Sequence, residues 1–380
     1  MIEIKQVTTK KDKKLFVEYP IKLYKDCPYY VPSLVGDELN NFDPKKNFSL
    51  KNSDYVAYLA YKDGVLVGRI AGIISYQDNE ISGKKSIRFS RFECIDDIEV
   101  FKALLSQIAK YGKEKGMEII HGPWGFNDQD REGMLTDGFD VRSTYATNYY
   151  YPYFHENLEK LGFEDESKWV EMCFEIPNEV DPRSKRLSGK LLEKYKLTEI
   201  ADKLTINQIV KQYGEKFFKT LDESYGHLDG YVPYDEDTQK NILDQFGTII
   251  NTRYISILVD ENDDVAAFGI CLPSICNALI KSRGRLFPFG FIDLLKSIKK
   301  PKELEMALIG LKKQYKNSGV NAIIINRIMQ NLIDDKIERI ESNPMLQTNH
   351  SIQQQWKFAK YEIVKQRQTY KMNIDDLLKA

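Results

Sequence analysis

The chain has 380 residues, 42% of them apolar, and this length predicts two domains rather than one. Its 55 Lys and Arg residues balance 56 Asp and Glu residues, so a net charge of −1 gives no general attraction for nucleic acid. Five scattered cysteines without a CxxC pair argue against disulfides and a zinc site, and no metal site is predicted. The longest apolar stretches are too short for a signal peptide or a membrane span, which predicts a cytoplasmic location.

The first half alternates strands and helices. Apolar periodicity and turn residues separate the elements, and an Asp-Gly turn at Asp63 and Gly64 predicts a hairpin. The predicted order is a strand (2–7), a helix (12–24), a hairpin (55–75), a strand (86–94), a helix (98–113) and a strand (117–121). Residues 196–372 repeat this order, which predicts two structurally similar halves.

Residues 122–153 form a loop that is rich in Tyr and Asn. Rigid amphipathic side chains of this kind are typical of recognition sites, and nearby carboxylates can attract a cationic amine. The alternative is that the rings pack over a sheet end and that the carboxylates cap a short helix. The candidate substrate-binding residues are Asn127, Asp128, Tyr149 and Tyr150, with Asp130 and Glu132 as further carboxylates.

The stretch from 303 to 335 reads as a strand, a cationic loop and a helix in immediate succession. An apolar run ends at Leu311. It is followed by the basic residues Lys312, Lys313 and Lys316, and helical periodicity begins at Asn321. The free N–H groups at a helix N-terminus favour a phosphate, and the lysines add positive charge. An ordinary connection in which polar residues only form the turn is the alternative.

Two motifs resemble the GNAT superfamily of N-acetyltransferases. The stretch from Tyr315 to Asn321 is similar to its acyl-coenzyme A pyrophosphate loop, Gln/Arg-x-x-Gly-x-Gly/Ala, with Lys316 at the first position and Gly319 at the first Gly, whereas Asn321 departs from the pattern. The stretch 157–163 is similar to the "YEKLGF" ending of GNAT domains. The whole chain resembles a bacterial family of tandem GNAT-like proteins.

This resemblance implies a mixed α/β fold of two tandem GNAT-like domains, 1–176 and 196–380, joined by a linker at 177–195. The donor would be acetyl-coenzyme A or another acyl-coenzyme A, bound by the second half, because Asp96 and Asp97 replace the phosphate loop in the first. The cofactor-binding residues implied are Ile309, Leu311, Lys316, Asn317, Ser318, Gly319, Val320, Asn321 and Ala322.

The expected reaction is N-acyl transfer, with acetyl as the expected acyl group, to a small amine or amino-acid-like acceptor. The catalytic base proposed from sequence is Glu341, at the end of a predicted strand. In GNAT enzymes a Tyr in the fourth helix often serves as the acid, but Leu158 and Trp356 stand there. Two alternatives stay open, a non-catalytic coenzyme A-binding or ligand-binding protein and a tandem-GNAT aminoacyl transferase. A homodimer is compatible with these features.

The apolar stretch 286–295 has no place in this scheme. It is too apolar for a solvated loop. It either walls a pocket for an acyl chain or hydrophobic acceptor, or forms a helix between the halves.

Overall fold

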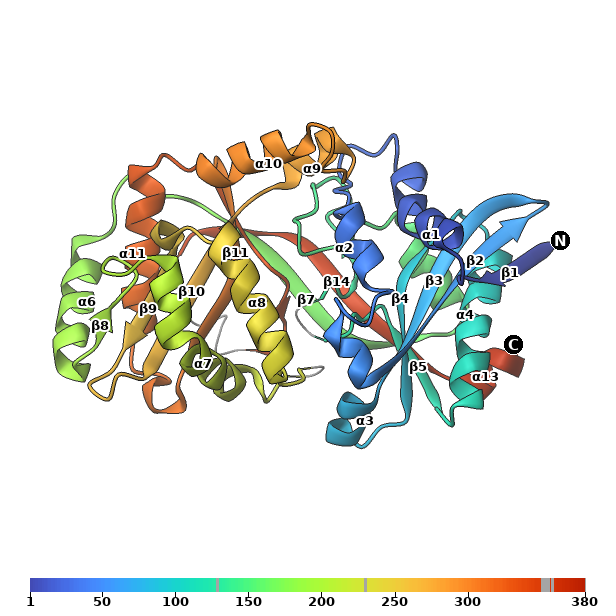
Figure 1. The fold of residues 1–380 in the computed structure, drawn as a ribbon, viewed down its shortest axis with the longest axis horizontal. Coiled ribbons are helices and arrows are strands. Elements are labelled where there is room, and N and C mark those ends of the chain that lie inside the picture. Colours follow the sequence, from blue (N-terminus) through green and yellow to red (C-terminus); the bar gives the residue numbers. More distant parts are fainter. Residues whose placement is uncertain (128–129, 229–230, 350–355, 357–358, 380) are drawn as a thin grey trace.

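The computed structural model describes residues 1–127, 130–228, 231–349, 356 and 359–379. Its strands form one continuous mixed sheet, ordered β1-β2-β3-β4-β5-β14-β7-β12-β11-β10-β9-β8, with β6 beside β14 and β13 beside β7. Helices pack on both sides of this sheet (Figure 1). The predicted mixed α/β fold is therefore confirmed. None of the described helices combines the length and the apolarity needed to cross a membrane.

The first half begins with local signals that the sequence makes clear. Thr9 caps the first helix through a capping box with Asp12, and Asp63 and Gly64 adopt positive φ in the hairpin turn. The elements are β1 (Ile2–Gln6), α1 (Lys10–Leu23), α2 (Val35–Asn40), β2 (Ser53–Lys62), β3 (Val65–Ser75), α3 (Tyr76–Ser82), β4 (Ser86–Cys94), α4 (Ile98–Glu114), β5 (Ile119–Gly122), β6 (Met134–Asp137), α5 (Tyr153–Lys160) and β7 (Glu164–Phe174).

The second half repeats the pattern with an insertion between its hairpin and the next strand. That insertion contains α9 (Cys276–Ser282) and α10 (Gly290–Lys299). The other elements are α6 (Pro182–Tyr195), β8 (Thr198–Glu199), α7 (Ile206–Tyr225), α8 (Glu236–Ile249), β9 (Ile255–Val259), β10 (Val265–Pro273), β11 (Glu303–Leu311), α11 (Asn321–Asp334), β12 (Arg339–Ser342), β13 (Met345–Leu346), β14 (Tyr361–Asn373) and α13 (Ile374–Lys379).

The two halves exchange their last strands. β7 pairs with β12 of the second half, β14 pairs with β5 of the first half, and the two lie side by side through the centre (Figure 1). The helix that comes after each exchanged strand also packs on the other half: α6, after β7, packs on α11, and α13, after β14, packs on α4. The segment expected to be a linker thus contains α6, which covers the second half. The domain limits themselves stay a prediction.

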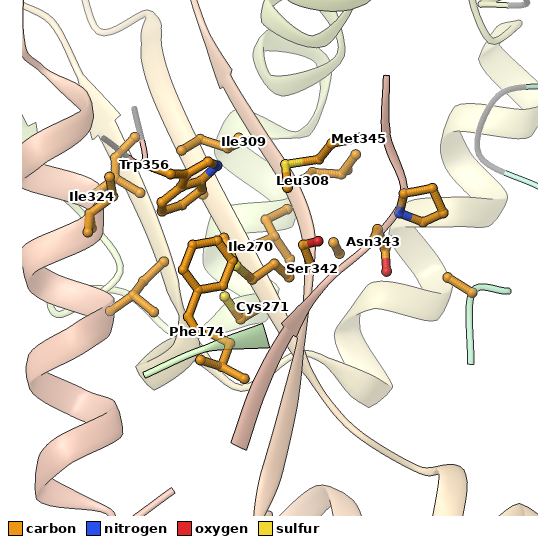
Figure 2. A pocket seen from close by; sticks show the side chains of 18 of the residues that line it. Phe174, Ile270, Cys271, Leu308, Ile309, Ile324, Ser342, Asn343, Met345 and Trp356 are labelled. Atoms are coloured by element: carbon orange, nitrogen blue, oxygen red, sulfur yellow. The ribbon is translucent and has the colours of Figure 1, made fainter. Parts of the chain in front are cut away.

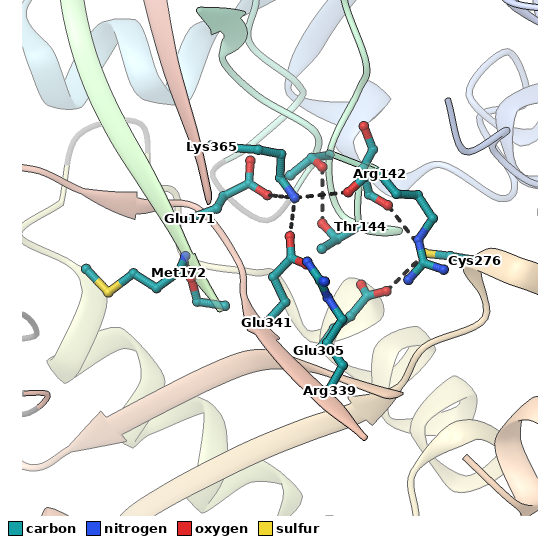
Figure 3. Close-up of polar contacts among 12 residues, drawn as sticks. Arg142, Thr144, Glu171, Met172, Cys276, Glu305, Arg339, Glu341 and Lys365 are labelled. Atoms are coloured by element: carbon teal, nitrogen blue, oxygen red, sulfur yellow. Dashed lines mark hydrogen bonds and ion pairs between the residues drawn. The ribbon is translucent and has the colours of Figure 1, made fainter. Parts of the chain in front are cut away.

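A buried ion cluster holds the exchanged strands in register (Figure 3). Lys365 and Arg367 of β14 both contact Glu171 of β7, and all three side chains are buried. Lys365 also contacts Glu341 of β12. Burial alone would raise the pKa of Glu171, but the charges of Arg367 and Lys365 outweigh it and lower that pKa. Slipping either strand would leave these charges buried without partners.

Candidate functional site

The loop between β11 and α11 has the geometry of an anion site. No described side chain caps the N-terminus of α11, and its first turn contains no acidic residue. Asn317 and Gly319 adopt positive φ, at 60° and 84°, which turns the chain into the helix. Helix N-terminal N–H groups without side-chain caps carry partial positive charge and suit a phosphate.

The side chains around this loop add to its positive potential. Lys312 pairs with Asp264, the two charged atoms being 3.0 Å apart, whereas the ammonium groups of Lys313 and Lys316 form no ion pair in the described part of the chain. The backbone N–H of Lys313 donates to Oε1 of Glu223. Desolvation, followed by the charges of Lys316 and Lys313, lowers the pKa of His227. The loop therefore has two cations available for an anionic ligand.

An apolar cavity of about 200 Å³ lies in the second half. It begins where β11 and β12 part, because these parallel strands pair only over residues 303–306 and 339–342. Figure 2 shows Ile324 and Trp356 on one side and Leu308, Ser342 and Met345 on the other. Its wall also includes Trp169, Phe174, Tyr225, Gly269, Ile270, Cys271, Met306, Ala307, Ile309, Ile325, Ile328, Met329, Leu332 and Asn343.

Unsatisfied polar atoms occur in this apolar wall. The indole Nε1 of Trp356 and the Oδ1 of Asn343 are buried and have no hydrogen-bond partner among the described residues. Such atoms are costly unless a ligand or water completes them. In addition, β11 has an irregular register against β10 at Ala307, a bulge that lies in the cavity wall. The cavity thus combines a large apolar volume with a few polar contacts, as ligand sites do.

Tyr225 of α7 occupies the open edge of β11. Its hydroxyl donates to the carbonyl of Ile309 at 3.2 Å and accepts from the N–H of Ile309 at 3.3 Å. This is the edge that β12 leaves after Met306, so an extended ligand that pairs with β11 at Ile309 must displace the hydroxyl.

The residues predicted to bind the cofactor lie together, because they follow one another along the chain. Ile309 lines the cavity, and the Leu311 carbonyl accepts from the hydroxyl of Ser224. The residues from Lys316 to Ala322 form the loop and the first turn of α11.

The four residues predicted from sequence to bind the acceptor do not lie together at the cavity. Tyr149 and Tyr150 are buried in the core of the first half, and Tyr149 donates to the carbonyl of Phe139 at 3.0 Å. Asn127 is half-buried, and Asp128 lies outside the described residues. From the same loop it is instead Asp130 and Glu132 that reach the cavity wall. The tyrosines that cluster in this loop pack in the core of the first half. The carboxylates of Asp130 and Glu132 belong to the part of the loop that contacts the second half.

Glu341 does not lie where a base for the cavity is needed. Alternation along β12 sends Ile340 and Ser342 to the cavity and Glu341 to the opposite face. There it contacts Lys365 and pairs with Arg339 at 2.7 Å (Figure 3). A carboxylate held by two cations in this way is a structural partner rather than a proton acceptor for the cavity.

Sequence reasoning missed much of the cavity wall. Trp169 and Phe174 come from β7, which reaches the second half only through the strand exchange. Tyr225 is the last residue of α7 and carries no motif. The wall residues that the sequence did single out include Ile309, Asp130, Glu132 and, through its fourth-helix position, Trp356.

No protein-family model matches the chain. Protein YghO of Escherichia coli is 28% identical over 356 residues, which cover 91% of this chain and 89% of that protein. A protein of Caulobacter vibrioides named bacterial ceramide synthase is 22% identical over 322 residues, which cover 82% of this chain and 81% of that one.

Solved structures share the architecture at low sequence identity. A tandem GNAT protein from the clavulanic acid biosynthesis pathway superposes with a TM-score of 0.57 and 8% identity, over 98% of this chain and 99% of that one. A GCN5-related N-acetyltransferase from Sphaerobacter thermophilus gives 0.53 and 6%, over 98% and 96%. The chain therefore has the tandem GNAT fold.

Proposed function

We propose that this protein is an acyl-coenzyme A-dependent N-acyltransferase. The observation that carries the proposal is the apolar cavity at the point where β11 and β12 part, between the two elements that the cationic loop joins. The second half binds the donor, and the first half contributes to the acceptor site. The fold of the neighbouring structures supports the same class of reaction.

The described residues fit an acyl-coenzyme A as donor. The loop N–H groups, Lys313 and Lys316 suit its pyrophosphate, and the cavity suits its acyl group. The donor supplies an activated thioester carbonyl to the attacking amine. Backbone N–H groups at the Ala307 bulge are proposed to polarise that carbonyl, and Asp130 and Glu132 are proposed to attract the ammonium form of the acceptor.

The acyl group is proposed to be longer than acetyl. An engineered apolar cavity of about 150 Å³ holds benzene, so a cavity of about 200 Å³ is larger than two carbons require. The similarity to a protein named bacterial ceramide synthase supports this assignment, since a ceramide is an amide of a fatty acid. The acceptor is proposed to be a small molecule with a primary amine.

The test has two steps. In the first, coenzyme A thioesters from acetyl to long-chain acyl are screened by thermal shift, where a ligand at a hundred times its Kd stabilises by about 2.7 kcal/mol. We expect the shift to rise with chain length until the cavity is full. In the second, free thiol is measured with a panel of amines. Binding without thiol release would indicate a non-catalytic ligand-binding protein, the alternative that the replaced fourth-helix Tyr favours.

A further inference from the structure

The insertion between β10 and β11 presents large apolar side chains to solvent. Phe287 and Phe289 are 79% and 72% exposed, and α10 has no buried residue. Phe291, Ile292 and Leu295 are exposed on one face of α10, at helical spacing. We call these five side chains the α10 patch. It lies along one edge of the molecule beside α9 (Figure 1), and none of its residues lines the cavity.

The α10 patch is mounted on a firmly anchored base. The carbonyl of Gly284 accepts from the N–H of Val35 at 2.9 Å, and a Cβ at Gly284 would lie 2.1 Å from the carbonyl oxygen of Ser33. Arg285 pairs with Glu18 of α1 at 2.7 Å. The aromatic rings therefore project from a fixed turn. Exposed apolar area of this kind costs about 25 cal/mol per Å² in water, so a covering partner would be stabilising.

Positive charge surrounds the patch. Residues 281–300 contain six basic residues against the single acid Asp293, although the whole chain carries a net charge of −1. Asp293 pairs with Lys281 at 2.7 Å. The remaining cations Arg283, Lys296, Lys299 and Lys300 have no acidic partner in the residues that the structure describes.

The combination of inserted rings and unpaired cations fits an anionic lipid surface. An interfacial helix buries its apolar face at the headgroup boundary while basic residues contact anionic lipids. A symmetric contact with a second copy of this chain would bring the same cations together and is disfavoured by repulsion. The patch is therefore better suited to contact an anionic lipid surface than the same patch of a second copy of this chain.

We propose that the α10 patch docks the protein on membranes containing anionic phospholipids, with Phe287 and Phe289 inserted between headgroups. The contact is peripheral, and it does not depend on acyl transfer. It would hold the protein where apolar substrates are concentrated.

The experiment is flotation of the full-length protein with phosphatidylcholine vesicles, with and without phosphatidylglycerol. We expect flotation only with phosphatidylglycerol, and less of it at high salt. Lys299→Glu with Lys300→Glu should weaken binding by roughly tenfold or more, since it replaces two cations that attract anionic headgroups with two anions that repel them. Phe287→Ser with Phe289→Ser should abolish it.

Matched controls distinguish the patch from general surface effects. Ile81→Ser removes an apolar side chain that is 60% exposed on α3, and Lys45→Glu with Lys46→Glu reverses two consecutive exposed lysines. Both should float like the wild type. A Phe287→Trp variant gives a positive signal, because its emission should shift to the blue when anionic vesicles are added.

Three outcomes would overturn the proposal: equal flotation of the Phe287→Ser, Phe289→Ser variant and the wild type, equal flotation with neutral vesicles, or no flotation. A vesicle-free dimer that the same serine substitutions dissociate in analytical ultracentrifugation would show that the patch is a self-association surface instead.

Discussion

Each half contains a strand, a loop and a helix in the same order, β4 to α4 in the first half and β11 to α11 in the second. The N-termini of the two helices differ in how they are capped. In the first half the carboxylate of Asp97 accepts from the N–H of Glu99, caps α4 and pairs with Lys62. In the second half no described side chain caps α11, and Lys313 and Lys316 lie beside it. A built-in anion thus occupies the first helix end, whereas the second has no described side-chain cap and is where we propose that an anion from solution binds.

The interiors also differ, since the core of the first half is filled with side chains and that of the second half contains a cavity. In both halves the parallel pair, β4 with β5 or β11 with β12, is short and then parts. In the first half the space beyond is filled by Phe92, Phe154 and Leu158, which are fully buried. In the second half it is the cavity. This comparison supports our proposal that one copy of the repeated fold supports the structure and that the other binds the ligand.

Disrupting the ion cluster that joins the exchanged strands should have the largest effect on the free energy of unfolding. Lys365→Ala leaves Glu171 and Glu341 short of a buried cation and should lower the free energy of unfolding by about 3–5 kcal/mol. Lys360→Ala removes an 81% exposed side chain that pairs with Glu175 at 3.5 Å, and should cost about 0–1 kcal/mol. Urea denaturation measures both. Equal losses would mean that the cluster does not join the halves.

Overpacking should distinguish the filled half from the hollow half. Leu158→Phe forces a larger side chain into a filled core and should destabilise by about 1–3 kcal/mol. Ile325→Phe projects into the cavity, should leave stability within about 1 kcal/mol, and should weaken long-chain acyl-coenzyme A binding by tenfold or more, about 1.4 kcal/mol. If Ile325→Phe keeps full affinity, the acyl group lies elsewhere.

A smaller effect concerns the open edge of β11. If the donor pairs with Ile309, the Tyr225 hydroxyl competes with it, and Tyr225→Phe should tighten acyl-coenzyme A binding by about 0.5–1.5 kcal/mol. Tyr213→Phe on the same helix removes a hydroxyl that donates to Asp263 and should leave affinity unchanged. Weaker binding by Tyr225→Phe would instead make the hydroxyl a ligand contact.

The smallest expected effect is a proton linkage at His227. Desolvation and the charges of Lys316 and Lys313 lower its pKa in the free protein. A bound phosphate would offset those charges and raise that pKa, so binding should take up protons and strengthen as the pH falls through the His range. Calorimetry in buffers of different ionisation enthalpy should detect uptake in the wild type and none in His227→Asn. Proton release on binding would contradict the placement of the phosphate.

The sequence predicts local features of this molecule well and distant ones poorly. The strand, loop and helix around Gly319 were found because neighbouring residues specify them. The exchange of β7 and β14 was not found, since strand pairing across the chain leaves no local pattern. The same exchange explains why Trp169 was missed. The position of Glu341 at a strand end did not show which face its side chain takes, because strand alternation decides that, and it directs Glu341 away from the cavity toward Lys365.

The central claim is that only the second half binds the donor, and calorimetric titration with a long-chain acyl-coenzyme A tests it most directly. We expect one site per chain, no binding by a folded Gly319→Val variant, and a loss of about 1–3 kcal/mol with weaker salt dependence for Lys316→Ala. Asp96→Ala, in the corresponding loop of the first half, should bind like the wild type. Normal binding by Gly319→Val, or its loss in Asp96→Ala, would contradict the account.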